Sequence, residues 1–372
     1  MRIPKLAVLA VPLLLSGAMA AGCSSSGTTA SSAAASSGTA GAATSACKIA
    51  LLLPENTTPR YESADKPYFE AQVAKLAPQC QVLYFNAAND GSLQTQQANT
   101  ALAEGAKVLV LDSADPQSGA AIVQTAAAKG VKTIAYDRMT GGPVALLTTF
   151  NAIQVGNLQG TALVSAMKAA GTPAGSQIVM INGDTSGYEA KLFKKGAQDT
   201  ITSAGFKIAA DYDTVGWDPN TAATEMTQAI TKLGKANIKG VYVANDTMAG
   251  AAINAMQQAG ITPLPPVTGQ DAATDGLQRI LLGTQTMTVY KRLKLLANDA
   301  ASAAVTIATG KPLPATTQSE VNQTGNTVPA MLLTPIAVTT ANMKSTVVAD
   351  GFVSISALCA GDTKSACTKS GI

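Results

Sequence analysis

Short apolar runs alternate with helical stretches along most of this chain. Each run is rich in Val, Ile and Leu, and the segments between them place apolar residues at helical spacing, as at Phe69, Val73 and Leu76. Strands buried on both faces read as continuous apolar runs, so the alternation predicts parallel sheets covered by helices. The runs span residues 49–53, 82–85, 108–111, 132–136, 178–181, 208–212, 241–244 and 287–290.

Two features divide the predicted α/β fold into two lobes. A chain of 372 residues is long enough for roughly two domains. In addition, the segment Gly119-Ala120-Ala121-Ile122 recurs as Gly250-Ala251-Ala252-Ile253, and each copy follows an apolar run and begins a helical stretch. We therefore expect two similar, doubly wound lobes.

Residues 1–22 have the features of a signal peptide. Arg2 and Lys5 precede an apolar run of about ten residues, which is too short to span a bilayer. The stretch Ala20-Ala21-Gly22-Cys23 resembles a bacterial lipobox and predicts lipidation of Cys23; cleavage after Ala20 is the alternative. Residues 24–46 are only Ser, Thr, Ala and Gly, so we expect residues 23–46 to form a flexible tether behind a lipid anchor.

The other four cysteines are an even number in a chain with an export signal, which suggests two disulfides. Cys47 and Cys80 each precede an apolar run, and adjacent parallel strands would bring these run starts together. Cys359 and Cys367 would close a short local loop. We favour the pairs 47–80 and 359–367 over the other pairings and over free buried thiols.

Composition excludes several classes of function. The sequence has no histidine, so no mechanism that needs an imidazole base or ligand is available, and we expect neither a metal nor a cofactor. Phosphate-binding loops, dinucleotide-binding glycine motifs and the Gly-x-Ser-x-Gly elbow are absent. The net charge is +3 without a basic block, so nucleic acid is not an expected partner.

Polar residues follow the predicted strands, where open α/β sheets bind ligands. Asp, Asn and Arg recur there, and each can serve two hydroxyl groups at once, while Trp217 could stack on the apolar face of a sugar ring. Core packing is the alternative for Trp217, and helix capping is the alternative for Asp112 and Asp246. Capping would not require Arg138 beside Asp137, so we favour ligand binding for that pair.

From about residue 48 to 353 the chain resembles the D-xylose-binding type of periplasmic sugar-binding proteins, the substrate-binding components of ABC sugar importers. The most specific segment is Gly283-Thr284-Gln285-Thr286-Met287-Thr288-Val289-Tyr290-Lys291. Shorter matching segments cover residues 135–139, 155–159, 190–193, 216–217, 245–246, 269–271 and 332–336.

This resemblance implies a type I periplasmic-binding-protein fold, in which two lobes are joined by a three-segment hinge. One lobe would hold residues 47–149 and 291–325, and the other residues 150–290 and 326–372. The implied sugar-binding residues are Arg60, Tyr61, Asp137, Arg138, Asn151, Glu189, Trp217, Asn245, Asp271 and Lys291. Three of them depart from the usual family residue: Glu189 replaces Asn, Asn151 replaces Asp and Tyr61 replaces Trp.

The resemblance implies a monosaccharide-binding protein and no catalysis. We expect a monomer, held by lipid on the outer face of the cytoplasmic membrane, that closes around xylose or a related aldopentose or aldohexose and delivers it to an ABC permease. A receptor that presents bound sugar to a chemoreceptor or sensor kinase is the alternative. Sugar-responsive repressors share the two-lobe core but carry a helix-turn-helix where this chain has its signal peptide. A secreted carbohydrate enzyme is the remaining class, and it would release reducing ends from an oligosaccharide.

Overall fold

The structure is a computed structural model that describes residues 47–316, 318–322 and 324–372. The expected signal peptide, Cys23 and the expected tether lie outside these residues. Among the helices that are described, none combines the length and the apolar character needed to cross a bilayer.

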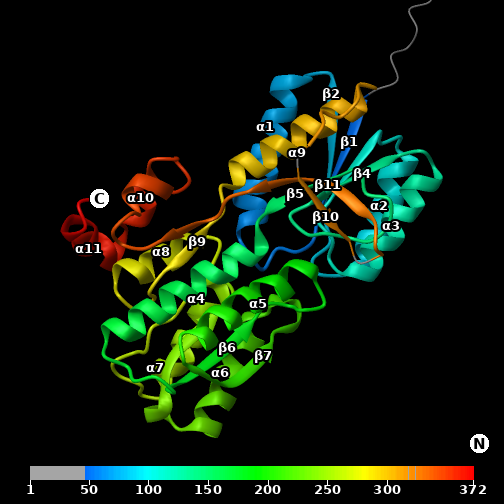
Figure 1. Cartoon of the computed structure of the whole chain (residues 1–372). Coiled ribbons are helices and arrows are strands. Elements are labelled where there is room, and N and C mark those ends of the chain that lie inside the picture. The colour runs from blue at the N-terminus through cyan, green and yellow to red at the C-terminus, as the bar shows by residue number, and fades with distance from the viewer. Residues whose placement is uncertain (1–46, 317, 323) are drawn as a thin grey trace, which may run out of the picture. The chain divides into compact units, whose positions relative to one another are not determined.

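The first lobe is built on a seven-stranded sheet (Figure 1). Its strands are β1 (Cys47–Leu53), β2 (Cys80–Asn86), β3 (Val108–Leu111), β4 (Lys132–Tyr136), β5 (Leu146–Phe150), β10 (Gln318–Val321) and β11 (Thr327–Leu333). Their order across the sheet is β10-β11-β5-β4-β3-β1-β2, and all neighbours are parallel except β10 and β11. Strand β3 is buried throughout, which explains its uninterrupted apolar sequence.

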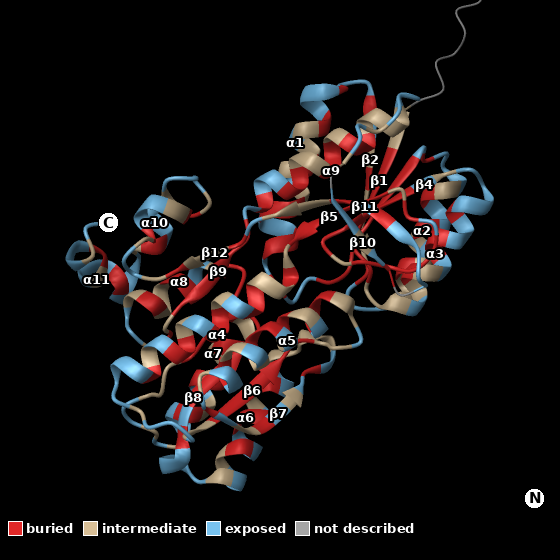
Figure 2. Ribbon diagram, viewed as in Figure 1, coloured by how far each residue is buried: buried red, intermediate tan, exposed pale blue. Residues whose placement is uncertain are grey.

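Helices cover both faces of this sheet, so its central strands β1, β3, β4 and β5 are enclosed (Figure 2). On one face Phe69 of α1 (Lys66–Leu76) and Leu296 of α9 (Leu293–Ala308) belong to one core with β1, β3 and β4. On the other face α2 (Gly91–Ala103) and α3 (Pro116–Ala128) pack through Ala98 and Ile122. A short π-helical turn, η1 (Tyr61–Asp65), precedes α1.

The second lobe has a smaller sheet of three parallel strands in the order β7-β6-β8. These are β6 (Gln177–Asn182), β7 (Lys207–Asp213) and β8 (Ile238–Val243). Four helices share its core, with α4 packed on α5 and α6 packed on α7. Their bounds are α4 (Ala152–Ala169), α5 (Tyr188–Ser203), α6 (Pro219–Leu233) and α7 (Asp246–Gln258), and two short turns, η2 (Val215–Trp217) and η3 (Lys235–Asn237), flank α6.

A C-terminal segment completes the fold beside the second lobe. It pairs β12 (Ile336–Val338) with β9 (Thr288–Tyr290) in an antiparallel ribbon and packs against α8 (Thr274–Leu281) through Val347 and Leu358. Its remaining elements are η4 (Lys344–Val348), α10 (Ile355–Leu358), η5 (Gly361–Thr363) and α11 (Lys364–Lys369).

Three stretches of chain join the two lobes, as the resemblance implies. They lie between β5 and α4, between β9 and α9, and between β11 and β12. The third differs from the expected boundary after residue 325, because residues 330–333 of β11 pair with β5 in the first lobe's sheet. We therefore place this boundary after Leu333, where the paired strand ends.

The structure contains both disulfides that the sequence favours. Cys47 and Cys80 are register partners at the starts of neighbouring parallel strands, and their sulfur atoms are bonded. Cys359 and Cys367 close a loop between α10 and α11. The first disulfide therefore ties the start of the first lobe's sheet, and the second ties the C-terminal segment.

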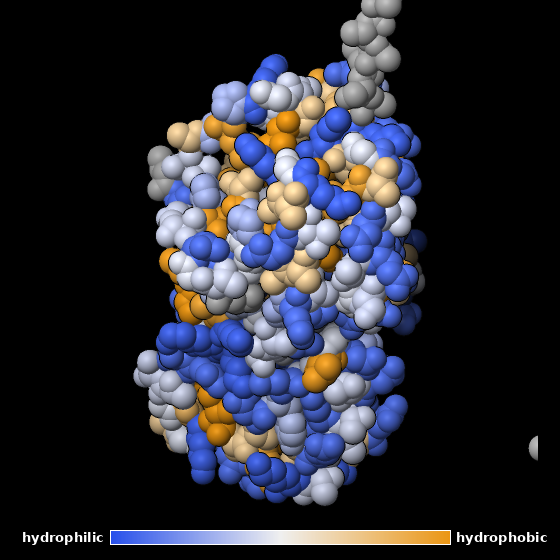
Figure 3. Space-filling view, turned by 90° about the vertical axis from the view of Figure 1, so that its right-hand side faces the viewer, coloured by the Kyte–Doolittle hydropathy of each residue, from blue (hydrophilic) through white to orange (hydrophobic). Residues whose placement is uncertain are grey.

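The molecular face in Figure 3 is mainly hydrophilic, with apolar residues in small groups. Such scattered apolar groups are normal for a protein surface.

Candidate functional site

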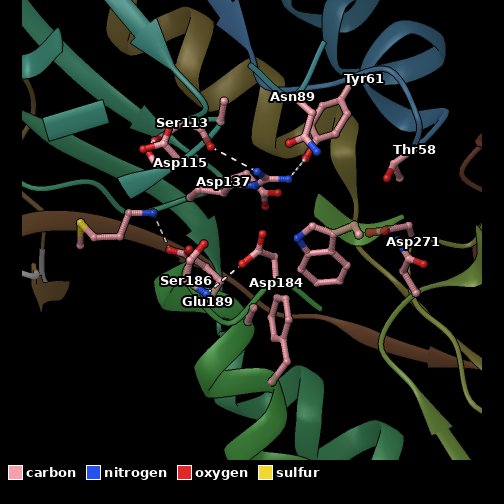
Figure 4. Close-up of a pocket in the computed structure, with 18 of the residues that line it drawn as sticks. Thr58, Tyr61, Asn89, Ser113, Asp115, Asp137, Asp184, Ser186, Glu189 and Asp271 are labelled. Carbon is pink, nitrogen blue, oxygen red and sulfur yellow. Dashed lines mark hydrogen bonds between the residues drawn. The ribbon is translucent and has the colours of Figure 1, made fainter. Parts of the chain in front are cut away.

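A pocket lies between the lobes, at the carboxyl ends of strands from both sheets. Figure 4 shows Asp137, Asp184, Glu189 and Asp271 arranged around this space. The first lobe contributes Thr58, Arg60, Tyr61, Asn89, Ser113, Ala114, Asp115, Pro116, Asp137, Arg138 and Met139. The second lobe and the hinge contribute Asp184, Ser186, Gly187, Glu189, Ala190, Phe193, Trp217, Asn245, Gln270, Asp271 and Lys291.

The structure brings together every residue proposed from the sequence except Asn151. Asn151 follows β5 at the first hinge crossing, where the chain turns directly into α4. Its side chain caps that helix, because Oδ1 accepts a hydrogen bond from Gln154 N at 3.1 Å. The expectation that Asn151 lines the pocket is therefore wrong.

Arg60 is the centre of a buried ion network. Its Nε and Nη2 atoms donate to the two carboxylate oxygens of Asp65 at 2.8 and 2.9 Å, and Nη1 donates to Asp137 Oδ2 at 2.8 Å. The Arg60 side chain is only 3% exposed. A bidentate pair with a third contact fixes the orientation of the guanidinium group, and with it the position of Asp137.

Lys291 joins the acidic residues of the two lobes. It follows β9 at the second crossing, and its Nζ lies 3.1 Å from Asp271 Oδ1 and 3.8 Å from Asp137 Oδ2. Burial opposes ionisation of Asp137, but Arg60 and Lys291 together hold its pKa below the usual range. Asp137 is therefore a carboxylate, able to accept hydrogen bonds, at any pH near neutral.

Arg138 also lines the pocket and has partners of its own. Its Nη2 donates to Tyr61 Oη and its Nη1 to Ser113 O, each at 3.2 Å, and its Nε is 3.4 Å from Asp112 Oδ1. Asp112 does not cap a helix, since Asp115 caps α3. Burial raises the pKa of Asp112 in spite of the attraction of Arg138.

Glu189 reaches from α5 of the second lobe to the first lobe. Its Oε1 accepts a hydrogen bond from Met139 N, so it connects the two sides of the pocket. Burial raises the pKa of Glu189 to about 8, despite the hydrogen bond from Met139. At neutral pH this side chain is mostly a neutral acid that can donate as well as accept, much like the Asn usual in the family that the chain resembles.

Trp217 supplies an aromatic surface to the pocket. Phe193 contacts it edge to face at 6.5 Å between ring centroids. A Cβ atom on Gly183 would lie 2.1 Å from the indole ring, so only glycine leaves room for the ring there. Trp217 packs partly against the core and also lines the pocket. Its position is therefore compatible with both predictions from the sequence, core packing and stacking on a sugar ring.

Four pocket residues other than glycine have left-handed backbone conformations. Their φ angles are 65° at Asn89, 58° at Asp137, 57° at Trp217 and 87° at Asp271. Such conformations are unusual outside glycine, and they tend to gather at functional sites where the side chain is needed. Their concentration here is independent evidence that this pocket is the functional site.

Asp246 supports the segment 270–273, which carries pocket residues, through hydrogen bonds to its carboxylate. Its carboxylate accepts hydrogen bonds from Gln285 Nε2 at 2.6 Å and from Thr288 Oγ1 and Ala273 N at 2.9 Å. A Cβ atom at Gly269 would lie 2.0 Å from Asp246 Oδ1, so the chain leaves space for this carboxylate. Asp246 is therefore neither the cap of α7, which is Asn245, nor a pocket residue.

Several lining residues were not among those proposed from the sequence. Asp184 follows β6, and Gln270 follows Val267, which forms an isolated bridge with Val241 of β8, so position alone could have suggested them. Asn89 donates to Gly216 O across the lobes at 3.3 Å, and this contact depends on how the lobes meet. The other polar or aromatic additions are Thr58, Ser113, Asp115, Ser186 and Phe193.

The chemistry of the pocket suits a polar ligand that both donates and accepts hydrogen bonds. Carboxylates, amides and guanidinium groups surround the space, and the aromatic side chains of Tyr61, Phe193 and Trp217 also line it. In the described part of the chain, no group of three or more His, Cys, Asp or Glu side chains could hold a metal ion. The arrangement is therefore one of hydrogen-bond partners around a cavity.

Comparison with known families gives a match that covers most of the fold. The family described as "Periplasmic binding protein domain" matches residues 49–312. The D-xylose-binding periplasmic protein of Escherichia coli (strain K12) is 34% identical over 310 residues, which cover 82% of this chain and 90% of that protein. The multiple sugar-binding periplasmic protein SbpA of Azospirillum brasilense is 30% identical, over 70% of this chain and 77% of that protein.

Solved structures agree with these sequence relatives. An ABC transporter solute-binding protein from Clostridium phytofermentans with bound β-D-glucose has a TM-score of 0.76 and 25% identity, and the match covers 84% of this chain and 99% of that one. A carbohydrate transporter solute-binding protein from Chloroflexus aurantiacus in complex with D-glucose has a TM-score of 0.74 and 27% identity, over 83% and 97% of the chains.

Proposed function

The chain belongs to the family of periplasmic binding protein domains, and on this premise we propose that it is the extracytoplasmic sugar-binding component of an ABC importer. The ligand is a monosaccharide, xylose or a related aldopentose or aldohexose, which the protein binds and releases without chemical change. The relatives that match over most of the chain are sugar-binding transport proteins.

The observation that carries this proposal is the set of buried hydrogen-bonding groups from both lobes around one pocket. Asp137 and Arg138 face it from the first lobe, Asp271 from the second, and Lys291 from the hinge. A ligand that bonds to both sides favours the closed arrangement, because it binds that arrangement more tightly than the open one. Closure would then present both lobes to a membrane permease.

The charges in the pocket favour a neutral sugar over a sugar acid. Its three basic residues are Arg60, Arg138 and Lys291, and each already faces a carboxylate within the protein. Asp115 and Asp184 add further negative charge to the lining. A ligand carboxylate would find no unpaired basic group among the described lining residues, so we expect uronic acids to bind more weakly than neutral sugars.

Fluorescence titration tests this function directly, because Trp217 is the only tryptophan of the chain and lines the pocket. Purified protein would be titrated with xylose, arabinose, glucose, galactose and glucuronic acid, with thermal shift as a second measurement. Sugar at about 100 times its Kd should stabilise the protein by about 2.7 kcal/mol. Failure of every neutral monosaccharide to change either signal would refute the proposal.

Two substitutions test whether the sugar binds in this pocket. Arg138→Ala and Asp271→Ala each remove a charged hydrogen-bond partner, so affinity should fall by about tenfold or more. Lys195→Ala is the control, because Lys195 forms an exposed ion pair with Asp199 away from the pocket. Full affinity in the two pocket variants would show that the sugar binds elsewhere.

We further propose that lipidated Cys23 holds the protein on the outer face of the cytoplasmic membrane. The support is the lipobox-like sequence before Cys23 and the Ser/Thr/Ala/Gly stretch after it. Cell fractionation of the full chain should place the wild type with membranes and Cys23→Ser in the extracytoplasmic soluble fraction. An unchanged distribution would exclude lipidation at Cys23 as the anchor.

A further inference from the structure

A groove opens beside the proposed sugar pocket. It lies between η1 and α1 of the first lobe and the starts of α7 and α8 of the second lobe. Thr58, Arg60, Gln270 and Asp271 line both spaces. The cavity volume of the groove is about 390 Å³, which leaves room for a sugar ring.

The walls of the groove also have the chemistry of a sugar site. Tyr68 and Phe352 supply aromatic surface, and Phe352 is held by Tyr290 at 4.9 Å between ring centroids. Thr247, Thr274 and Asp275 add hydroxyl and carboxylate groups. Aromatic faces next to hydroxyl and carboxylate groups suit the C–H face and the hydroxyls of a neutral sugar unit.

The junction between the two spaces contains a buried acceptor that lacks a partner. Gln270 lines both spaces and is only 2% exposed, and its buried Oε1 receives no hydrogen bond within the described structure. Buried polar atoms without a partner are uncommon and point to a missing donor. Across the junction Arg60 Nη1 and Asp271 Oδ1 are 3.9 Å apart, which is longer than a hydrogen bond.

From these observations we propose that the groove is a second subsite, which holds a neutral sugar unit linked glycosidically to the sugar in the pocket. The protein then binds a disaccharide as well as a monosaccharide. This inference rests on the proposed function, and it extends the ligand class from free sugars to glycosides.

Isothermal titration calorimetry of the full chain tests the second subsite with two matched pairs, D-xylose with xylobiose and D-glucose with cellobiose. Thr274→Trp fills the groove from an exposed position at the first turn of α8. Thr231→Trp is the matched control, since Thr231 is also exposed, on α6, and lines neither space.

In the wild type we expect the disaccharide of the pair whose monosaccharide binds to have a Kd within about tenfold of that monosaccharide. Thr274→Trp should weaken the disaccharide by about tenfold or more and change the monosaccharide by less than about twofold. Monosaccharide binding without any disaccharide binding would overturn the second subsite and leave the proposed function intact. Equal weakening of both ligands in Thr274→Trp would also overturn it, and binding of no sugar at all would overturn the proposed function itself.

Discussion

Replacement of Arg60 by Met should destabilise the first lobe strongly. The side chain is 3% exposed and donates three hydrogen bonds of 2.8–2.9 Å to two carboxylates, Asp65 and Asp137, that are themselves 1% and 12% exposed. Removal of one partner from a buried ion pair leaves an uncompensated charge and costs about 3–5 kcal/mol. We therefore expect Arg60→Met to lower the free energy of unfolding by about that amount.

A double variant separates the charge from the lost packing. Asp65→Asn removes the carboxylate that Arg60 pairs with twice, so Arg60→Met combined with Asp65→Asn leaves less unpaired charge than Arg60→Met alone. The loss in the double variant should be smaller than the sum of the two single losses by about 1–3 kcal/mol. Sugar affinity should not recover, because Asp137 still lacks its Arg60 contact.

Urea unfolding followed by far-UV circular dichroism measures these free energies. Arg292→Met is the control, since Arg292 pairs with Asp350 at 3.0 Å but the side chains are 44% and 33% exposed. An exposed pair of this kind contributes at most about 1 kcal/mol. The reasoning fails if Arg60→Met is as stable as Arg292→Met, or if the two losses at Arg60 and Asp65 are additive.

Three further changes test the supports of the site. Gly183→Ala should displace the Trp217 ring, because its Cβ would lie 2.1 Å from that ring, and fluorescence titration should show about tenfold weaker sugar binding; unchanged affinity would contradict this packing role. Burial raises the folded-state pKa of Glu189 to about 8 from an ordinary value of 4.5, so its contribution to stability is complete below about pH 4.5 and is lost as pH rises through 8. Thermal unfolding from pH 5 to 9 should therefore show a weaker decline for Glu189→Gln than for the wild type, and parallel curves would exclude Glu189 as the titrating group. Asp246→Asn removes one acceptor behind the segment that carries Asp271, so sugar affinity should fall by several-fold without loss of any direct contact; a loss of stability at unchanged affinity would leave Asp246 a purely structural role.

The sequence predicts the strands that are continuous apolar runs, and all eight of these runs overlap strands in the structure. It does not reveal β5, whose apolar pattern is interrupted by Thr148 and Thr149 although both are buried. It also misses β11, because Pro329 argues against a strand within a sheet, yet β11 lies between β5 and β10. An apolar run therefore predicts a buried strand only when all the buried side chains of that strand are apolar.

Site prediction worked where position along the chain determines position in space. Strand ends gather at one edge of each sheet, so Asp137, which follows β4, and Asn245, which follows β8, could be proposed from the sequence. Asn151 also follows a strand, but its side chain turns back to cap α4. Asn89 could not be foreseen, since its contact with Gly216 exists only because the two lobes meet there. The assignment of all these residues to sugar binding stays a prediction until the titrations are made.

At Asn89, Asp137, Trp217 and Asp271 the left-handed backbone lowers the stability of the fold, while the side chain serves ligand binding. Thermal stability and ligand affinity therefore favour different residues at these positions. Each such residue costs on the order of 1–3 kcal/mol, which glycine would recover at the loss of the side chain that faces the pocket. A laboratory selection for thermal stability alone should therefore accumulate glycine at these four positions and erode binding. Selection in the presence of sugar should retain the four original side chains. The residues at these positions would therefore show whether a variant was selected for stability alone or also for binding.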